Sequence, residues 1–83
     1  MKMNNSYYET LPMTDLNLAV TCLTLGHQIL RIEKLTPNKV QFIFKKSPEL
    51  ENLIEAYWNN ALKVSPLEFA NNLKSTKSRI YSN

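Results

Sequence analysis

The residues best suited to chemistry lie near the C-terminus, where basic and aromatic side chains recur at helical spacing. Lys74, Lys77 and Tyr81 are separated by three and four residues, which places them on one side of a helix. Lysine and arginine side chains contact phosphates, and a tyrosine stacks on a base or a sugar. With an earlier basic pair added, the candidate nucleic-acid-binding residues are Lys45, Lys46, Lys74, Lys77, Arg79 and Tyr81.

The charge distribution points to an anionic partner. The net charge is +3, and residues 1–62 carry six basic and six acidic side chains, so that the whole excess lies in residues 63–83. A second interpretation stays open, because cations close to the C-terminal end of a helix are stabilised by the helix dipole alone. If the surface binds nucleic acid, we expect recognition to be electrostatic, sensitive to salt and weakly selective for sequence.

The sequence contains few residues suited to phosphate-loop, metal or catalytic chemistry. Gly26 is the single glycine, and one glycine cannot build a phosphate-binding loop. Cys22 and His27 are the single cysteine and histidine, whereas structural zinc needs about four such ligands. Cys22 lies in an apolar run and is expected to be buried as a small hydrophobe. Glu51 and Glu55, four residues apart, fit a solvated helix face better than a metal site. We therefore expect no catalytic residue, no metal and no cofactor, and we do not expect an enzyme.

The helices and strands that carry these side chains can be predicted from the spacing of apolar residues, which changes along the chain. Residues 1–13 show no period and are predicted to be a flexible N-terminal arm. Thr14 is expected to cap a helix that ends before Gly26, which suits the left-handed position after a helix. This helix carries two apolar stripes, and the second consists of Leu18, Cys22 and Leu25. We expect the second stripe to pack either against another layer of the domain or against a partner chain.

An alternating pattern follows this helix and predicts an antiparallel hairpin. Leu30 and Ile32 are expected on one side of the first strand, and a turn at residues 36–39 reverses the chain. The second strand has an apolar face formed by Val40, Phe42 and Phe44. Because a lone hairpin is marginal in water, we expect its apolar face to rest on helices or its edge to pair with another strand.

Two more helices complete the domain. Ser47 and Pro48 are typical of a helix start, and the stripe that follows predicts that Trp58 belongs to the core. Ser65 and Glu68 form a capping box at the start of the last helix. Its inner stripe is predicted to be Phe69, Ala70, Leu73 and Ile80. The predicted fold class is α+β, with a helix, an antiparallel β-hairpin and two helices packed on the hairpin, in one compact domain over residues 14–83.

Six short strings in this order are D-L-N-L-A from Asp15, G-H at Gly26, F-I-F at Phe42, S-P-E-L at Ser47, A-Y-W at Ala56 and K-V-S-P-L-E-F at Lys63. Together they resemble a small uncharacterised domain family of prokaryotes and their phages, over about Asp15 to Tyr81. The resemblance implies a single compact α+β unit and a phage or mobile-element setting. It implies no catalytic activity and transfers no site to this chain.

Two functions are open on this basis. The first is a small non-enzymatic accessory protein that binds nucleic acid through its basic C-terminal helix. The alternative is a protein-binding or assembly adaptor, homodimeric or part of a larger assembly, that uses apolar surface of the first helix and the hairpin. No run approaches the ~20 apolar residues of a membrane span, and the N-terminal residues lack the apolar centre of a signal peptide. We therefore expect a cytoplasmic protein without membrane contact.

Overall fold

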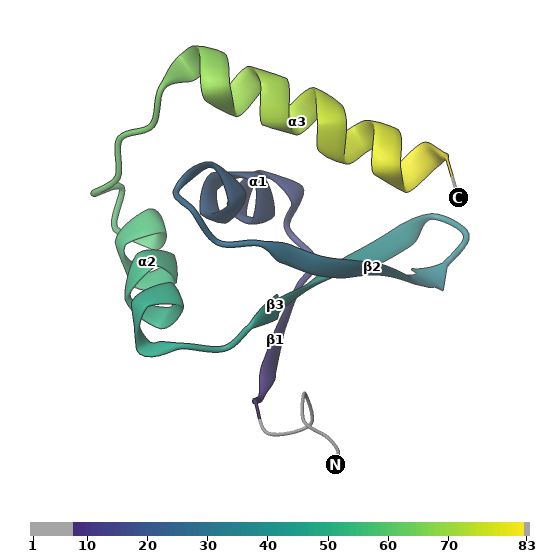
Figure 1. The fold of residues 1–83 in the computed structure, drawn as a ribbon, viewed down its shortest axis with the longest axis horizontal. Coiled ribbons are helices and arrows are strands. Elements are labelled where there is room, and N and C mark those ends of the chain that lie inside the picture. Colours follow the sequence, from purple (N-terminus) through teal and green to yellow (C-terminus); the bar gives the residue numbers. More distant parts are fainter. Residues whose placement is uncertain (1–7, 83) are drawn as a thin grey trace.

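The fold is built on the central strand of a three-stranded antiparallel sheet (Figure 1). The computed structural model describes residues 8–82. Strand β3 lies between β1 and β2, so that both of its edges are paired. The α+β class predicted from the sequence is confirmed, with a further strand at the start. The elements are β1 (Thr10–Met13), α1 (Leu16–Thr24), β2 (Ile29–Thr36), β3 (Lys39–Lys45), α2 (Pro48–Trp58) and α3 (Pro66–Tyr81).

The predicted N-terminal arm, residues 1–13, extends too far, because its last four residues form β1. Leu11 and Met13 alternate toward the core, where Met13 is buried. Pro12 weakens the strand signal in the sequence, since proline cannot donate a ladder hydrogen bond, but an edge strand tolerates it. β1 therefore provides the strand pairing that the hairpin needed at its edge. Residues 1–7 of the predicted arm lie outside the described residues.

Helix α1 has the predicted end and a shifted start. Asp15 is the N-cap in place of Thr14, and its carboxylate accepts a backbone hydrogen bond of 3.0 Å from the residue three positions on. At the other end Gly26 has the predicted positive φ, 104°. The His27 N–H donates to the Cys22 carbonyl at 2.9 Å, which closes a Schellman motif and satisfies a carbonyl that the helix leaves open.

Helix α1 lies between the sheet and α3 (Figure 1). Leu18 and Cys22 of its second apolar stripe are buried in the core with Phe42 and Phe44 of β3. Leu25, at the end of the helix, is exposed. Of the two alternatives for this stripe, the described residues show the first, in which it packs against layers of the same domain.

Strand β2 has a bulge that changes which of its side chains face the core. Ile29 pairs with Phe44, but Arg31 already pairs with Ile43, so that Leu30 is left between two paired positions. Ile29 is therefore buried and Leu30 exposed, so that Ile29 faces the core with Ile32 in place of the predicted Leu30. A bulge places one extra residue in a strand and redirects the side chains around it.

Helix α2 ends before its apolar stripe does. Asn60 adopts a positive φ of 57°, and the Ala61 N–H donates to the Ala56 carbonyl at 2.9 Å, as in a Schellman motif. Trp58 thus stands in the last turn and at the edge of the stripe, and it is 63% exposed. The prediction that Trp58 belongs to the core is wrong. Its ring meets the ring of Tyr57 edge to face, with the centroids 5.0 Å apart.

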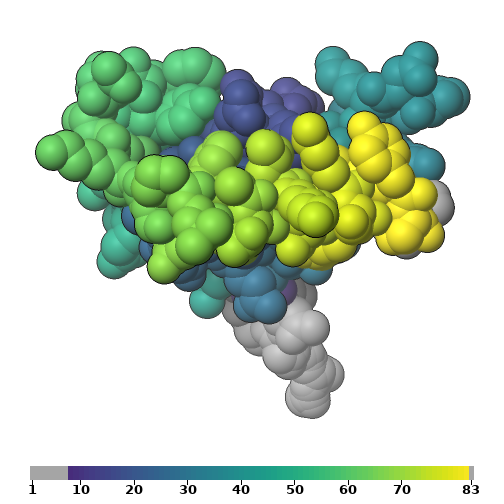
Figure 2. Space-filling view, turned by 90° about the horizontal axis from the view of Figure 1, so that it is seen from above, coloured from purple at the N-terminus to yellow at the C-terminus, as the bar shows by residue number. Residues whose placement is uncertain are grey.

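Helix α3 packs on α1 through a face that is more polar than predicted. Thr76 is the fully buried side chain of α3, and the Asn72 amide donates to Thr24 Oγ1 of α1 at 3.0 Å. Ala70, predicted to face inward, is exposed. The remaining predicted inner residues are partly buried, namely Phe69, Leu73 and Ile80. Seen from above, α3 crosses the molecule and ends on the side where the β2–β3 hairpin projects (Figure 2).

Candidate nucleic-acid interface

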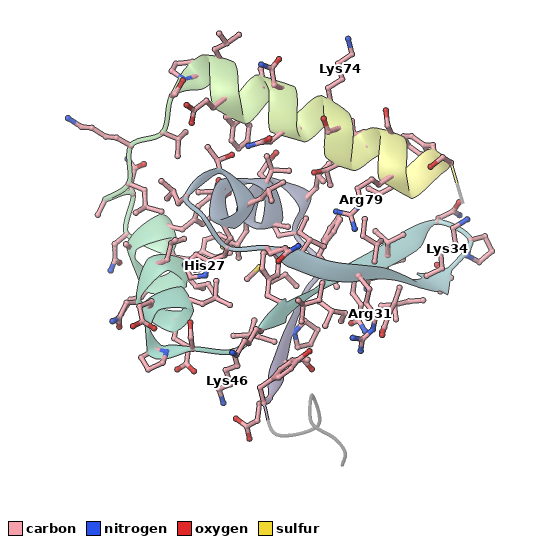
Figure 3. All side chains as sticks on the ribbon, viewed as in Figure 1. His27, Arg31, Lys34, Lys46, Lys74 and Arg79 are labelled. Atoms are coloured by element: carbon pink, nitrogen blue, oxygen red, sulfur yellow. The ribbon has the colours of Figure 1, made fainter. Side chains whose placement is uncertain are left out.

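The two lysines at the end of β3 do not join the basic residues of α3. Lys46 Nζ lies 3.5 Å from the Glu9 carboxylate and 3.9 Å from that of Glu51. Lys45 Nζ lies 5.3 Å from the centroid of the Tyr8 ring. Figure 3 shows Lys46 near the start of α2, on the opposite side of the molecule from α3. Lys45 and Lys46 therefore lie in a local cluster apart from the other candidate residues, which are on α3.

The basic residues of α3 project from different sides of the helix. Lys77 and Tyr81, four residues apart, share one flank. Arg79 is two residues from each of them, about 200° around the helix axis. Lys74 points away from the body of the molecule, whereas Arg79 points toward the sheet (Figure 3). Helix α3 thus keeps Lys74 and Lys77 on the flank of Tyr81, as their spacing predicted, and separates Arg79 from this flank.

A cleft of about 440 Å³ opens where the tip of the hairpin meets the end of α3. Ligand clefts in proteins typically measure about 300–1,000 Å³. Three segments form its walls: the hairpin around its turn, the chain that leads into the first residue of α1 and the last two residues of α3. We call it the basic cleft, and it is lined by Thr14, Leu16, Lys34, Pro37, Asn38, Lys39, Val40, Phe42, Ile80 and Tyr81.

The lining of the basic cleft combines cations with apolar surface. Lys34 comes from β2 and Lys39 from β3, so that the two strands of the hairpin each provide one lysine. Phe42 at the base is buried, whereas Tyr81 is 80% exposed and stands at the opening. Among residues 8–82, the lining of this cleft contains no aspartate or glutamate. The cleft therefore offers a positive rim above an apolar floor.

The acidic residue next to Lys34 faces away from the cleft. Glu33 pairs with Gln41 across the sheet, while Lys34 pairs with Val40, and successive residues of a strand point to opposite faces. The Glu33 carboxylate accepts hydrogen bonds from Gln41 at 2.9 Å and from Arg31 at 2.7 Å. These two hydrogen bonds lower the pKa of Glu33. Its negative charge is thus paired on the other face of the sheet from the cleft.

Sequence reasoning missed Lys34 and Lys39, which the structure brings together with Tyr81. A usable signal existed, because both lysines lie close to the two-residue turn at 37–38 and therefore at one end of the sheet. What the sequence did not show is that α3 ends beside this turn. The seven residues of β3 also put Lys45 about 20 Å from Lys39, which explains why one strand carries two unrelated basic sites.

The residues considered for other chemistry are placed differently. Cys22 is fully buried, as predicted, and burial raises the pKa of its thiol to about 11, so that the thiol stays protonated near neutral pH. Among residues 8–82, no three His, Cys, Asp or Glu side chains gather in a way that could hold a metal ion. In the same residues, no helix has the length and apolar character needed to cross a membrane.

A second hollow, of about 430 Å³, lies at the connection between α2 and α3. Trp58 and Tyr57 contribute its aromatic surface, and the described residues that line it carry no charge. Leu67, just after this connection, is 70% exposed. We call this the aromatic hollow, and it is lined by Thr21, Tyr57, Trp58, Asn60, Leu62 and Val64.

Comparison with known proteins tests the family resemblance. Neither curated proteins nor solved structures give a match to this chain. Comparison with protein families gives a match over residues 5–82. This range includes the three strands, the three helices and every sequence string quoted above. The chain therefore belongs to the family described as a domain of unknown function (DUF5659).

Proposed function

We propose that this protein is a non-enzymatic accessory protein that binds nucleic acid through the basic cleft and the adjoining Lys77. One observation carries the proposal: Lys34 and Lys39 of the hairpin and the exposed Tyr81 of α3 line one cleft, and its described lining contains no aspartate or glutamate. A phage or mobile-element setting, which the family resemblance implies, is part of the same proposal.

The mechanism is the neutralisation of phosphates by lysines. Each lysine that contacts a phosphate releases condensed counterions, so that affinity falls as salt rises. With Lys34, Lys39 and Lys77 in contact, the logarithm of the binding constant should fall against the logarithm of salt with a slope of about −2 to −3. Selectivity for sequence should be weak, because lysine contacts to phosphates carry no base information.

The test is a pair of charge reversals with a matched control. Lys39→Glu combined with Lys77→Glu removes charge at the basic cleft, while Lys45→Glu combined with Lys63→Glu removes it elsewhere. Each pair changes the net charge by four, from +3 to −1, so a general charge effect would be equal in both. Affinity for labelled mixed-sequence DNA and RNA pools is measured by fluorescence anisotropy from low to physiological salt.

We expect the Lys39/Lys77 pair to lose about tenfold in affinity for each reversed lysine and to flatten the salt dependence. The Lys45/Lys63 pair should lose clearly less. Lys74→Glu alone should weaken binding less than Lys77→Glu alone, because Lys74 lies about 10 Å from Tyr81 along the helix axis and Lys77 about 6 Å. Absence of binding by the unmodified protein at low salt, or equal losses in both pairs, would contradict the proposal.

Protein binding is a second candidate function, and the exposed Trp58 and Leu67 are the observation that favours it. This moves the adaptor surface from α1, whose apolar stripes are largely covered, to the connection between α2 and α3. Sedimentation of the free protein over a range of concentrations tests whether the partner is a second copy. An unmodified protein that self-associates, with Trp58→Ser monomeric and folded, would support this candidate, and a monomer at all concentrations would exclude a homodimer.

A further inference from the structure

The basic cleft is larger and more apolar than phosphate binding requires. A phosphate needs cations and hydrogen-bond donors, which a flat surface can present. This cleft has instead a volume of about 440 Å³ and a floor formed by Leu16, Val40, Phe42 and Ile80. Phe42 is 1% exposed, so the floor is continuous with the hydrophobic core. An apolar floor of this kind suits a flat, apolar ring system.

An aromatic side chain stands at the opening of the same cleft. Tyr81 is 80% exposed at the end of α3, which leaves its ring available to a ligand. Lys77, one turn earlier on the same flank, places a cation beside it. Proteins that bind single-stranded nucleic acid combine such elements, because bases stack on aromatic rings while cations follow the backbone.

Side chains that can hydrogen bond lie at the rim. Asn38 in the hairpin turn carries an amide with donors and an acceptor, and Thr14 before α1 carries a hydroxyl. Both residues are exposed. Such groups can meet the edge of a base whose Watson–Crick positions are open. In a duplex those positions are already paired and the base faces are stacked on one another, so that neither the floor nor Tyr81 would reach them.

We infer that the basic cleft receives an unpaired base of single-stranded nucleic acid, with Tyr81 stacked on that base or its neighbour and Lys34 and Lys39 at the flanking phosphates. The inference rests on the proposed function and adds to it the class of nucleic acid. The selection arises because a single strand can turn a base into the cleft without losing a base pair, whereas a duplex must first open one.

The experiment compares single strands with a duplex of the same sequence, each as DNA and as RNA. Anisotropy titrations at one fixed low salt concentration use the unmodified protein, Tyr81→Leu, Tyr81→Phe and Tyr8→Leu. Tyr8→Leu is the matched control, because Tyr8 is an exposed tyrosine beside Lys45, away from the cleft. Tyr81→Phe keeps the ring and removes the hydroxyl. Because Tyr81 is exposed, Tyr81→Leu should fold, and circular dichroism checks that it does.

We expect single strands to bind more tightly than the duplex by at least about tenfold. Tyr81→Leu should lose about five- to hundredfold in affinity for single strands, which is the range for one stacked base, with little change for the duplex. Tyr81→Phe, which keeps the ring that stacks, should lose far less affinity than Tyr81→Leu, and Tyr8→Leu should stay close to the unmodified protein. Binding to DNA strands, to RNA strands or to both supports the inference equally, and the comparison identifies which sugar is accepted.

A second measurement reports stacking directly. Trp58 is the single tryptophan of the chain, so Trp58→Phe combined with Tyr81→Trp places one fluorophore at the cleft. Its emission should be quenched on binding a single strand. Equal affinity for strands and duplex, with no loss in Tyr81→Leu and no quenching, would overturn the inference and leave the proposed function standing. No binding to either form would overturn both.

Discussion

The two sides of α1 are held by different kinds of contact. On the side of the sheet, Leu18 and Cys22 are buried in an apolar cluster with Phe42 and Phe44. On the side of α3, the contact includes the hydrogen bond from Asn72 to Thr24 Oγ1 and the buried Thr76, whose hydroxyl has no hydrogen-bond partner among the described residues.

The difference predicts which of the two contacts should open first when the domain is destabilised. Apolar burial on the sheet side holds the fold, because it removes the largest side chains from water. Helix α3 has 16 residues but fully buries only Thr76, so its attachment is the less apolar of the two. The end of α3 also forms one wall of the basic cleft. Changes on this side of α1 should therefore disturb the cleft before they unfold the domain.

The largest loss of stability should result from a substitution on the side of α1 that faces the sheet. Leu18→Ala leaves a cavity in the core and should lower the free energy of unfolding by about 2–5 kcal/mol. Leu25→Ala, in the same stripe but 39% exposed, should lower it by less than about 1 kcal/mol. Urea denaturation followed by circular dichroism measures both. Similar losses in the two variants would mean that the core does not lie where the buried residues place it.

A smaller effect is expected on the α3 side. Asn72→Ala removes the hydrogen bond to Thr24 and should cost about 1 kcal/mol. Hydrogen exchange should become faster in the amides of α3 while those of β3 stay protected. Asn71→Ala is the control, because Asn71 is the exposed neighbour of the same residue type. Equal acceleration of exchange in both variants would show that the cross-helix hydrogen bond does not hold α3 on α1.

The buried hydroxyl of Thr76 offers a gain of stability. Thr76→Val replaces the unpaired Oγ1 by a methyl group of similar size, which should raise the free energy of unfolding by about 1 kcal/mol. A change of this size moves the thermal midpoint of a domain of this length upward by about 4–8 °C. Thr76→Ser keeps the hydroxyl, loses the methyl group and should be less stable. A destabilised Thr76→Val would indicate that the hydroxyl has a partner in solution, such as a bound water.

The smallest effect should come from the aromatic hollow, which is away from both sides of this comparison. Trp58→Ser should change the free energy of unfolding by less than about 1 kcal/mol, because Trp58 is 63% exposed. Its affinity for nucleic acid should equal that of the unmodified protein, in contrast to Tyr81→Leu. A loss of affinity as large as that of Tyr81→Leu would move the binding surface to the other end of α3.

Much of the local structure could be predicted because it depends on residues close together in the chain. Gly26 follows α1 with a positive φ, and the hydroxyls of Ser47 and Ser65 accept the backbone N–H three residues on, as the capping signals indicated. The apolar face of β3 was equally clear from its alternation. The bulge at Leu30 and strand β1 were missed, because a bulge changes the period and Pro12 weakens a strand that exists only through its pairing with β3.

The sequence by itself determined the α+β class, the end of α1 at Gly26, the starts of α2 and α3 and the C-terminal excess of positive charge, since each follows from composition or from spacing within a few residues. Only the tertiary structure decided which charges share a surface. It separated Lys45 and Lys46 from α3 and brought Lys34 and Lys39 to Tyr81. The physical reason is that these neighbours are set by how α3 crosses α1, and that crossing depends on side-chain packing between segments far apart in the chain.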